Sequence, residues 1–549
     1  MERRILARWN ILLHVKIRHG DCFEKNDVSE INGCIKGGGM VFIFMKLFKA
    51  SSIITVLICF SSVNAADQIH FGSTGNPLNG LTVTWHSTNT NDSIKWGYTS
   101  GYEQGEFSGV RRTNYSGFLY DYAFPALQPS AILHYSLYDG SWGPEKTFKT
   151  SIDTSSTSFT FIASGDCQMN NYDLGIWKTN WQTCANAVGA EEADFNIQLG
   201  DHVSQLTAWG VSEWDSLFRY GINLFENKLI YHTIGNHDNT WDEYEQHLSG
   251  AALRICNLFV HPNNDNDFWY SFEFGNTAII CLNSQYPDSL AQYEWLLQTL
   301  QNANNTGKTW KAVFFHRPFF TQYRSASNNM DPYFGTWWKA FDDYGVDIVL
   351  NGHKHNYEVM KPVNMNMNTA APVAEYGSGP DQGRLEIVSG NMGSENAPTP
   401  VAARPNSTFW YNDRSAYCLN YCKFQVNGNT MRISAVHPSG FLIDSFSLHK
   451  DISAAQRNMK ASHPVAIDAF PDPFNASLTI HLQLPVAVKS KIEAHIFNIR
   501  GTLVDKLSAD RAELSHGIPW NAGHLKSGVY VIRIKAGNNT FVKRVSLIK

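Results

Sequence analysis

The sequence is poor in charge, and it has no excess of positive charge. Charged residues make up 17% of the 549 positions, and the formal net charge is −5 at pH 7. A general nucleic-acid-binding protein normally shows a basic patch or stripe, so this composition argues against such a protein and against a nuclease. Hydrophobic residues reach 43%, which indicates a folded chain. Its length exceeds what one hydrophobic core serves, so we expect about three domains.

The apolar run near the N-terminus is too short to cross a bilayer. It spans residues 53–60 (IITVLICF), whereas a transmembrane helix needs about 20 apolar residues. Two lysines precede the run and small residues follow it, which is the pattern of a secretory signal peptide. We therefore predict that residues 1–65 are a leader with no stable membrane span, translated from Met45 and cleaved after Ala65. A membrane anchor is the alternative.

Cysteine is scarce as well. The sequence holds 9 cysteines, and Cys22, Cys34 and Cys59 lie in the predicted leader. The remaining even number, in an exported chain, permits disulfides. Cys418 and Cys422 are close in sequence and are the expected pair, with buried free thiols as the alternative.

Three patterns of hydrophobicity follow the leader. Residues 66–150 alternate between apolar and polar positions over short runs punctuated by Gly, Asn, Ser and Thr, as in an all-β domain. Residues 159–450 alternate apolar strands with helix-like segments, which predicts a layered α/β domain. Residues 463–549 return to about seven short alternating strands. We predict a multidomain chain in which an α/β domain is flanked by two all-β sandwich domains.

Polar residues stand at the carboxyl end of nearly every apolar run of the α/β domain. They occur in GDCQ (165–168), GDH (200–202), GNHD (235–238), His316 and GHKH (352–355). Ligand sites of α/β sheets lie at the carboxyl ends of the strands, and glycine allows the chain to leave each strand sharply. The five groups are therefore expected to meet at one edge.

The residues in these groups suit metal ions. Carboxylates, an amide oxygen and imidazoles are ligands for first-row dications, and one carboxylate can bridge two ions in a hydrolytic site. The candidates are Asp166, Gln168, Asp201, Asn236, His237, His316, His353 and His355. Each alone has an ordinary structural explanation, such as a turn, a helix cap or a satisfied histidine. Their repetition at successive strand ends favours a metal site.

The series GD-x-Q, GD, GNHD, V-x-x-H and GH-x-H resembles the calcineurin-like metallophosphoesterase family. With a β-sandwich before it, the chain looks most like a purple acid phosphatase. The resemblance implies a four-layer α/β metallophosphoesterase sandwich for residues 159–450 and a fibronectin type III-like domain for residues 66–150.

The resemblance also implies a role for each residue. Asp166 and His355 would hold a first metal ion, Asp201 would bridge, and Asn236, His316 and His353 would hold a second ion. His237 would sit above the phosphate as a proton donor, and Asp238 would orient it. The ions would be two divalent or trivalent metals, Fe, Mn or Zn, and a hydroxide bridging them would attack phosphorus.

The sequence departs from purple acid phosphatases at three points. Ser204 stands where they carry a tyrosine ligand, so an iron(III) charge-transfer colour is not expected. Gln168 stands where ordinary metallophosphoesterases carry a histidine ligand and purple acid phosphatases a glycine, and we expect its carbonyl oxygen to face the first ion or its amide to bond the metal-bound water. Histidines that would bind substrate between His316 and His353 are missing, which leaves Arg317 and Arg324 as candidate phosphate-binding cations.

Residues 463–549 resemble a C-terminal sorting domain of the bacterial type IX secretion system, with a further binding sandwich as the alternative. The resemblance implies export machinery as a partner and a secreted or outer cell-surface location. Together these features predict a secreted binuclear phosphoesterase that hydrolyses small phosphomonoesters. The alternatives are a phosphodiesterase with the same site and a non-catalytic surface binding or adhesion protein.

Overall fold

The computed structural model describes most of the chain. The described residues are 28–36, 40–49, 52–61, 66–113, 117–169, 175–204, 210–238, 258–262, 269–322, 330–366, 383–394, 399–406, 409–450, 467–470, 473–482, 492–509, 518–536 and 539–549. Strands β1 (Val28–Lys36), β2 (Met40–Lys49) and β3 (Ser52–Ser61) pair antiparallel within the predicted leader. Ala65 lies outside the described residues, and cleavage after it stays a prediction.

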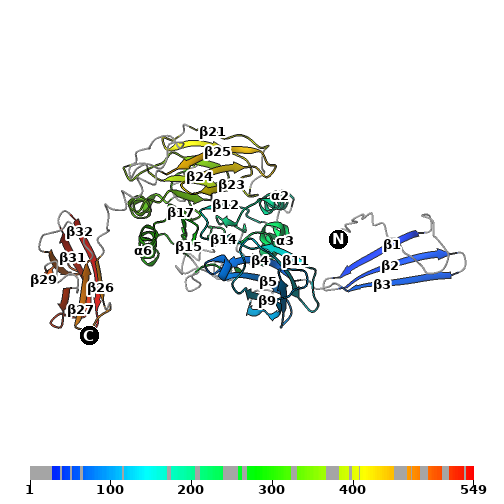
Figure 1. The fold of residues 1–549 in the computed structure, drawn as a ribbon, viewed down its shortest axis with the longest axis horizontal. Helices are drawn as coiled ribbons and strands as arrows, with labels where there is room; N and C mark the ends of the chain where they lie inside the picture. The colour runs from blue at the N-terminus through cyan, green and yellow to red at the C-terminus, as the bar shows by residue number, and fades with distance from the viewer. Residues whose placement is uncertain are drawn as a thin grey trace, which may run out of the picture.

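The next part of the chain forms two sheets of four strands each (Figure 1). One has the order β4-β5-β9-β8 and the other β11-β10-β6-β7. The strands are β4 (Asp67–Ser73), β5 (Leu81–Ser87), β6 (Ser93–Gly97), β7 (Gly105–Ser108), β8 (Val110–Thr113), β9 (Phe118–Ala123), β10 (Ile132–Tyr138) and β11 (Lys146–Lys149), with the short helix α1 (Pro77–Gly80) between β4 and β5. Trp85 of β5 and Trp96 of β6 are buried in one shared core, which continues to Phe159 and Phe195 of the following domain. The all-β reading of residues 66–150 agrees with these sheets, and their fibronectin type III-like character stays a prediction.

The α/β domain is built on two larger sheets. The first has six strands in the order β14-β13-β12-β23-β24-β25, and the second has eight in the order β15-β16-β17-β18-β20-β19-β22-β21. The first contains β12 (Ser158–Ser164), β13 (Phe195–Gln198), β14 (Ile230–His232), β23 (Tyr421–Asn427), β24 (Thr430–Val436) and β25 (Leu442–His449). The second contains β15 (Tyr270–Phe274), β16 (Thr277–Cys281), β17 (Trp310–Phe314), β18 (Ile348–Asn351), β19 (Tyr357–Met360), β20 (Leu385–Ser389), β21 (Arg404–Pro405) and β22 (Asn412–Ala416).

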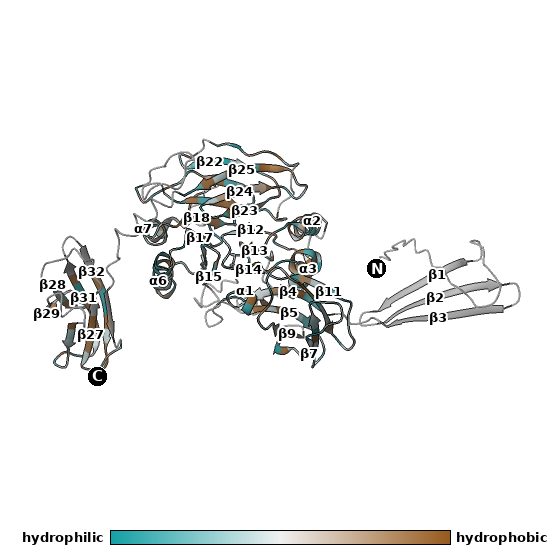
Figure 2. Ribbon diagram, in the orientation of Figure 1, coloured by the Kyte–Doolittle hydropathy of each residue, from teal (hydrophilic) through white to brown (hydrophobic). Residues whose placement is uncertain are grey.

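Alternating side chains of these strands face two different cores, because successive residues of a strand point to opposite faces. Phe161 of β12 and Leu350 of β18 lie in the core shared by the two sheets. Ile162 packs outward with helices α2 (Ile176–Ala190), α3 (Gly210–Tyr220) and α4 (Ile222–Phe225). Val349 packs outward with α6 (Leu290–Asn305), the 3-10 turn η1 (Asp331–Tyr333), the π-helical turn η2 (Phe334–Trp338) and α7 (Lys339–Asp343). The result is the α/β/β/α order of four layers, and Figure 2 shows the hydrophobic segments within its strands.

The strands that precede the candidate residues run parallel to their neighbours. β12, β13 and β14 pair in parallel, as do β16, β17, β18 and β20. The apolar runs that precede the five polar groups, at residues 159–164, 194–199, 229–234, 310–315 and 346–350, form strands β12, β13, β14, β17 and β18. Their carboxyl ends bring the polar groups to one side of the two sheets.

The predicted disulfide is wrong. Cys418 and Cys422 are both free and buried. Cys418 Sγ faces the carbonyl oxygen of Val401 at 3.9 Å, whereas Cys422 belongs to β23, opposite Ala163 of β12 and Ala435 of β24. The two thiols have different surroundings because Cys422 lies within strand β23, whereas Cys418 precedes that strand.

The C-terminal part forms two further sheets, β26-β27-β30 and β29-β28-β31-β32. The strands are β26 (Ile467–Phe470), β27 (Ser477–Leu482), β28 (Ile492–Asn498), β29 (Leu503–Ala509), β30 (Ile518–Asn521), β31 (Gly528–Ala536) and β32 (Asn539–Leu547). They enclose their own core around Trp520 and Ile532, in line with the expected alternating strands. Among the helices described, none has both the length and the apolar character needed to span a membrane.

Candidate metal centre

The backbone at the strand ends adopts a conformation that few residues other than glycine accept. Positive φ angles occur at Asp166 (62°), Gln168 (40°), Asp201 (54°) and His353 (68°). Such angles are costly for residues with a side chain and concentrate at functional sites. Four of the predicted ligands thus have strained backbones, which indicates that the fold is organised around their positions.

The predicted second metal position brings together atoms that carry lone pairs. His316 Nε2 lies 3.2 Å from Asp201 Oδ2 and 3.1 Å from Asn236 Oδ1. Ligand atoms of Asp201, His316 and His353 all lie within 4.8 Å of one another. His353 Nε2 is buried without a hydrogen-bond partner.

The tautomer of His316 makes this arrangement suitable for a cation. Its Nδ1–H donates to the carbonyl oxygen of Leu199 at 2.8 Å, so in the neutral ring Nε2 is a bare acceptor. Nε2 then faces two oxygen acceptors, Asp201 Oδ2 and Asn236 Oδ1, and a cation relieves their repulsion. The donor set of carboxylate, amide oxygen and imidazole therefore fits a first-row dication.

His353 is held in the form that binds metals. Burial, together with the nearby His316 and Lys354, lowers its pKa to about 2. A neutral imidazole is the form that coordinates metal ions, so this shift favours the metal-binding form of His353.

The first position is arranged differently. His355 Nε2 lies 3.7 Å from Asp166 Oδ1, and both carboxylate oxygens of Asp166 accept from the backbone N–H of His353 at 2.9 Å. The amide nitrogen of Gln168 lies 3.0 Å from Asp201 Oδ2 and 3.2 Å from His355 Nε2. A hydrogen-bond donor therefore lies between the predicted ligands Asp201 and His355, where the first of our two expectations for Gln168 placed its carbonyl oxygen. The second expectation, a hydrogen bond from its amide to a metal-bound water, stays a prediction.

The two carboxylates differ in their electrostatics. Burial, together with the charge of Asp201, raises the pKa of Asp166 well above its usual range. Burial also acts against ionisation of Asp201, but His316 and the backbone N–H of His237 outweigh it and lower the pKa of Asp201. Without ions, Asp201 is the charged member of the pair, and a cation bound near Asp166 would favour ionisation of both.

The predicted partnership between His237 and Asp238 is wrong in part. His237 Nδ1 donates to the carbonyl oxygen of Ser204 at 2.7 Å, and this contact fixes its ring. Asp238 instead accepts from the backbone N–H and Nδ1 of His202, at 2.8 and 3.0 Å, and from Gly235 N–H at 2.9 Å. Through these contacts Asp238 joins the loops after β13 and β14.

Arg317 lies near the metal centre, and Arg324 lies outside the described residues. The Arg317 side chain is half-buried, and its Nε is buried without a hydrogen-bond partner. Burial lowers the pKa of Arg317, while the charge of Asp201 raises it. The guanidinium thus has an open donor and lies close enough to the Asp201 carboxylate for their charges to interact.

Sequence reasoning missed a further loop at the same edge, residues 389–394 after β20. The backbone N–H of Ser394 donates to the Asp166 carbonyl oxygen at 3.2 Å. Asn391 Nδ2 donates to the His355 carbonyl oxygen at 3.3 Å. The signal was present, since β20 is also an apolar run followed by glycine and asparagine. His202 was missed as well, although it follows Asp201 directly.

A group of buried histidines lies behind this edge. The ring centroid of His232 is 6.0 Å from that of His202 and 5.6 Å from that of His261. Burial, followed by the charges of His261, His202 and His70, lowers the pKa of His232 well below its usual range. Burial also lowers the pKa of His70, although its contacts with two carbonyl oxygens oppose the shift.

We expect acid to destabilise the metal-free protein through these histidines. Below the unfolded-state pKa of about 6.5, the unfolded chain binds a proton that folded His232 excludes, so stability falls as pH falls. Each such histidine contributes a slope of up to about 1.4 kcal/mol per pH unit. The thermal midpoint, measured in chelator, should fall less steeply between pH 8 and pH 5 for His232→Phe than for the wild-type protein. Phenylalanine is chosen because aromatic rings surround this position. Equal slopes would contradict this assignment.

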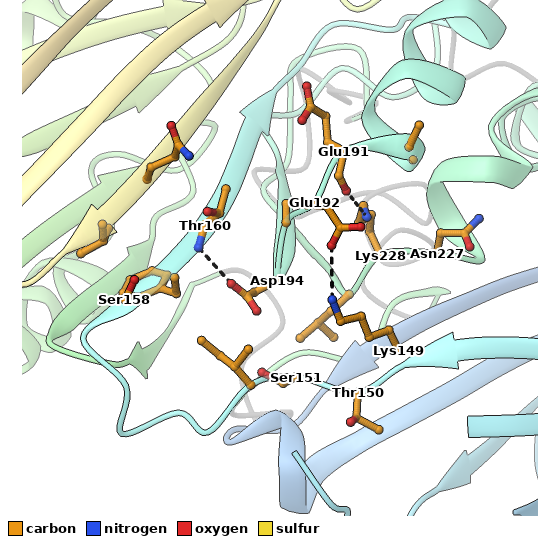
Figure 3. A pocket seen from close by; sticks show the side chains of 18 of the residues that line it. Lys149, Thr150, Ser151, Ser158, Thr160, Glu191, Glu192, Asp194, Asn227 and Lys228 are labelled. Atoms are coloured by element: carbon orange, nitrogen blue, oxygen red, sulfur yellow. Dashed lines mark hydrogen bonds and ion pairs between the residues drawn. The ribbon is translucent and has the colours of Figure 1, made fainter. Parts of the chain in front are cut away.

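One cavity among the described residues lies away from the candidate metal centre, between the N-terminal sheets and the α/β domain (Figure 3). Its volume is about 960 Å³. Lys149 pairs with Glu192 at 3.2 Å, Lys228 Nζ donates to the carbonyl oxygen of Glu191 at 2.5 Å, and Asp194 accepts from Thr160 N–H at 2.9 Å. Lys149, Lys228 and Asp194 therefore already have partners within the protein. We look for the catalytic site at the strand ends instead.

Comparison with known proteins gives matches to two families. The calcineurin-like phosphoesterase family matches residues 159–357, and the secretion system C-terminal sorting domain matches residues 468–548. Purple acid phosphatase 22 of Arabidopsis thaliana is 23% identical over 310 residues, 54% of this chain and 68% of that protein. A nucleotide pyrophosphatase/phosphodiesterase of Hordeum vulgare is 24% identical over 260 residues, 44% of this chain and 68% of that protein.

Among solved structures, purple acid phosphatase PPD1 from seeds of yellow lupin (Lupinus luteus) matches with a TM-score of 0.62 and 18% identity. The match covers 76% of this chain and 81% of that one, and it supports the fold. The alignments with the first curated relatives span from 31% to 68% of those proteins' lengths.

Proposed function

Because the chain contains a calcineurin-like phosphoesterase domain, from a family of metal-dependent hydrolases, and ends in a secretion sorting domain, we propose that it hydrolyses phosphomonoesters outside the cell. The sorting domain indicates a secreted or cell-surface protein. The observation that supports the catalytic proposal most directly is the convergence of Asp201, Asn236, His316 and His353 on one point with their lone pairs facing one another.

Two ions would be held at this edge, one by that group and one by Asp166, His355 and the shared Asp201. When bound, the ions would polarise the phosphoryl oxygens and activate water as the nucleophile. The donor atoms suit Fe, Mn or Zn. Ser204 offers no phenolate, so we expect a colourless protein.

The chain's own residues would position the ester and manage the leaving group. Arg317 would donate to a phosphoryl oxygen through its open Nε–H, since a guanidinium matches phosphate geometry. His237 has its Nδ1–H fixed on Ser204, which leaves Nε2 to carry a proton to the leaving oxygen. Asp238 would act at a distance, by holding the loop of Asp201 through His202.

A phosphodiesterase is the second candidate, because the barley relative bears that activity in its name. Both reactions would use the same ions, and the choice depends on the walls around the ester. The ratio of monoester to diester turnover decides between them.

The proposal is tested by metal analysis and hydrolysis with the chain from Ala66. We expect bound transition metal, hydrolysis of p-nitrophenyl phosphate faster than of its bis-ester, and loss of activity in chelator. His353→Ala should lose the metal of the second position and most activity. A protein without metal, and inactive after addition of Mn²⁺, Zn²⁺ or iron, would contradict the enzyme proposal and favour a surface binding protein.

A further inference from the structure

The amide of Gln168 distinguishes the two metal positions. Its nitrogen carries two N–H groups and no lone pair, so it cannot bind a metal ion. These N–H groups meet Asp201 Oδ2 at 3.0 Å and His355 Nε2 at 3.2 Å. Both acceptors are predicted ligands of the first ion. The amide N–H groups therefore satisfy the same lone pairs that the ion would bind.

The orientation of this amide is set by its neighbours. In the opposite orientation Gln168 Oε1 would face Asp201 Oδ2 and the lone pair of His355 Nε2. All three atoms would then be acceptors, and they repel one another unless a cation lies between them. The side chain is only 4% exposed, so it cannot exchange these contacts for water without rearrangement.

The backbone of Gln168 is fixed as well. Its N–H donates to the carbonyl oxygen of Asp201 at 2.9 Å, and the next residue, Met169, donates to that of His202 at 3.0 Å. Met169 also forms an isolated parallel β-bridge with Val203. Rotation of the amide plane is therefore the simplest movement that could turn Oε1 toward the first position.

The second position has no such donor between its ligands. His353 Nε2 has no hydrogen-bond partner, and His316 Nε2 faces only acceptors, Asp201 Oδ2 and Asn236 Oδ1. When the His316 ring is neutral, its proton lies on Nδ1 against the Leu199 carbonyl oxygen, and an ion entering the second position then displaces no hydrogen bond between ligands. An ion entering the first position must break two, one of them to a carboxylate, where hydrogen bonds are strongest.

We propose that Gln168 makes the two positions unequal, so that the protein binds one ion tightly at the second position and the other weakly at the first. This inference rests on the proposed function for the identity of the two positions. Binding of the first ion would require the amide to turn from donor to ligand. Gln168 is thus a residue that sets metal occupancy.

The test is metal binding to the chelator-stripped chain from Ala66, measured with Mn²⁺ by titration calorimetry and elemental analysis. We expect two steps whose dissociation constants differ by at least about tenfold, equivalent to ~1.4 kcal/mol. Gln168→Glu keeps the shape and replaces both donors with acceptors, so it should bring the two constants together. Gln168→His offers a second route, because histidine tolerates the positive φ better than most residues.

Electron paramagnetic resonance gives a readout independent of activity. One equivalent of Mn²⁺ should give an isolated ion in wild type and a larger share of spin-coupled pairs in Gln168→Glu. Gln104→Glu, at an exposed glutamine, controls for an added surface carboxylate and should match wild type.

The outcomes separate the inference from the proposed function. Two equal ions in wild type, or unchanged constants in both Gln168 variants, would overturn the inference and leave the phosphoesterase proposal standing. Unequal ions that respond to Gln168→Glu, without ester hydrolysis by the loaded protein, would support the inference and overturn the proposed function. A wild-type chain that binds no Mn²⁺, and that also stays metal-free and inactive with Zn²⁺ or iron, would overturn both.

Discussion

Asp201→Asn is expected to lose both metal ions and the hydrolytic activity that depends on them. One carboxylate oxygen of Asp201 faces His316 Nε2 at 3.2 Å and Gln168 Nε2 at 3.0 Å, and the other accepts from His237 N–H at 2.8 Å. An asparagine must place its NH₂ group at the position of one of the two carboxylate oxygens. There the NH₂ group would either point at a metal ion or face the N–H of His237. It also removes the only charge shared by the two positions.

The expected loss of metal affinity is at least about 100-fold, because changes in residues that merely support ligands already cost 10–100-fold. Metal analysis after gel filtration and hydrolysis of p-nitrophenyl phosphate measure it. Asp153→Asn makes the same chemical change at an exposed carboxylate and should match wild type. A fully metallated, active Asp201→Asn protein would exclude Asp201 as the bridging ligand.

The position of the site could be predicted because strand ends leave a strong pattern in sequence. Buried apolar runs identify β12, β13, β14, β17 and β18, and parallel strands of a layered domain end at one edge. The convergence of Asp201, His316 and His353 follows from that topology. Once the topology is known, the residue types at these strand ends are enough to predict a cluster of atoms that carry lone pairs.

Contacts within the loops could not be predicted in the same way. Asp238 follows His237 directly, yet its carboxylate points to His202 in a different loop, because the direction of a side chain in a turn depends on the local backbone. The same holds for Gln168, because the sequence does not tell whether its amide oxygen or its amide nitrogen faces the site. The loop at residues 389–394 was missed because it contains no carboxylate or imidazole, whereas each of the five groups found at the other strand ends contains at least one.

The glycine before the second-position ligands gives the other large prediction. A Cβ added to Gly235 would lie 2.1 Å from Asp201 Oδ1 and 2.2 Å from Asp201 N. The first contact is with a ligand group and the second with backbone, which cannot move aside as a flexible side chain could. Gly235 N–H also donates to Asp238 at 2.9 Å, so the loop cannot shift freely.

Gly235→Ala is therefore expected to displace the Asp201 carboxylate and to reduce metal binding by about as much as Asp201→Asn, at least ~100-fold. Overpacking of this kind also costs about 1–3 kcal/mol of folding stability, so metal-free thermal midpoints should fall too. Gly335→Ala is the matched control, because nothing lies within 4 Å of the added Cβ. If Gly235→Ala bound metal normally while Asp201→Asn did not, the carboxylate would have room to move, and the close packing of the two loops would not be what holds it in place.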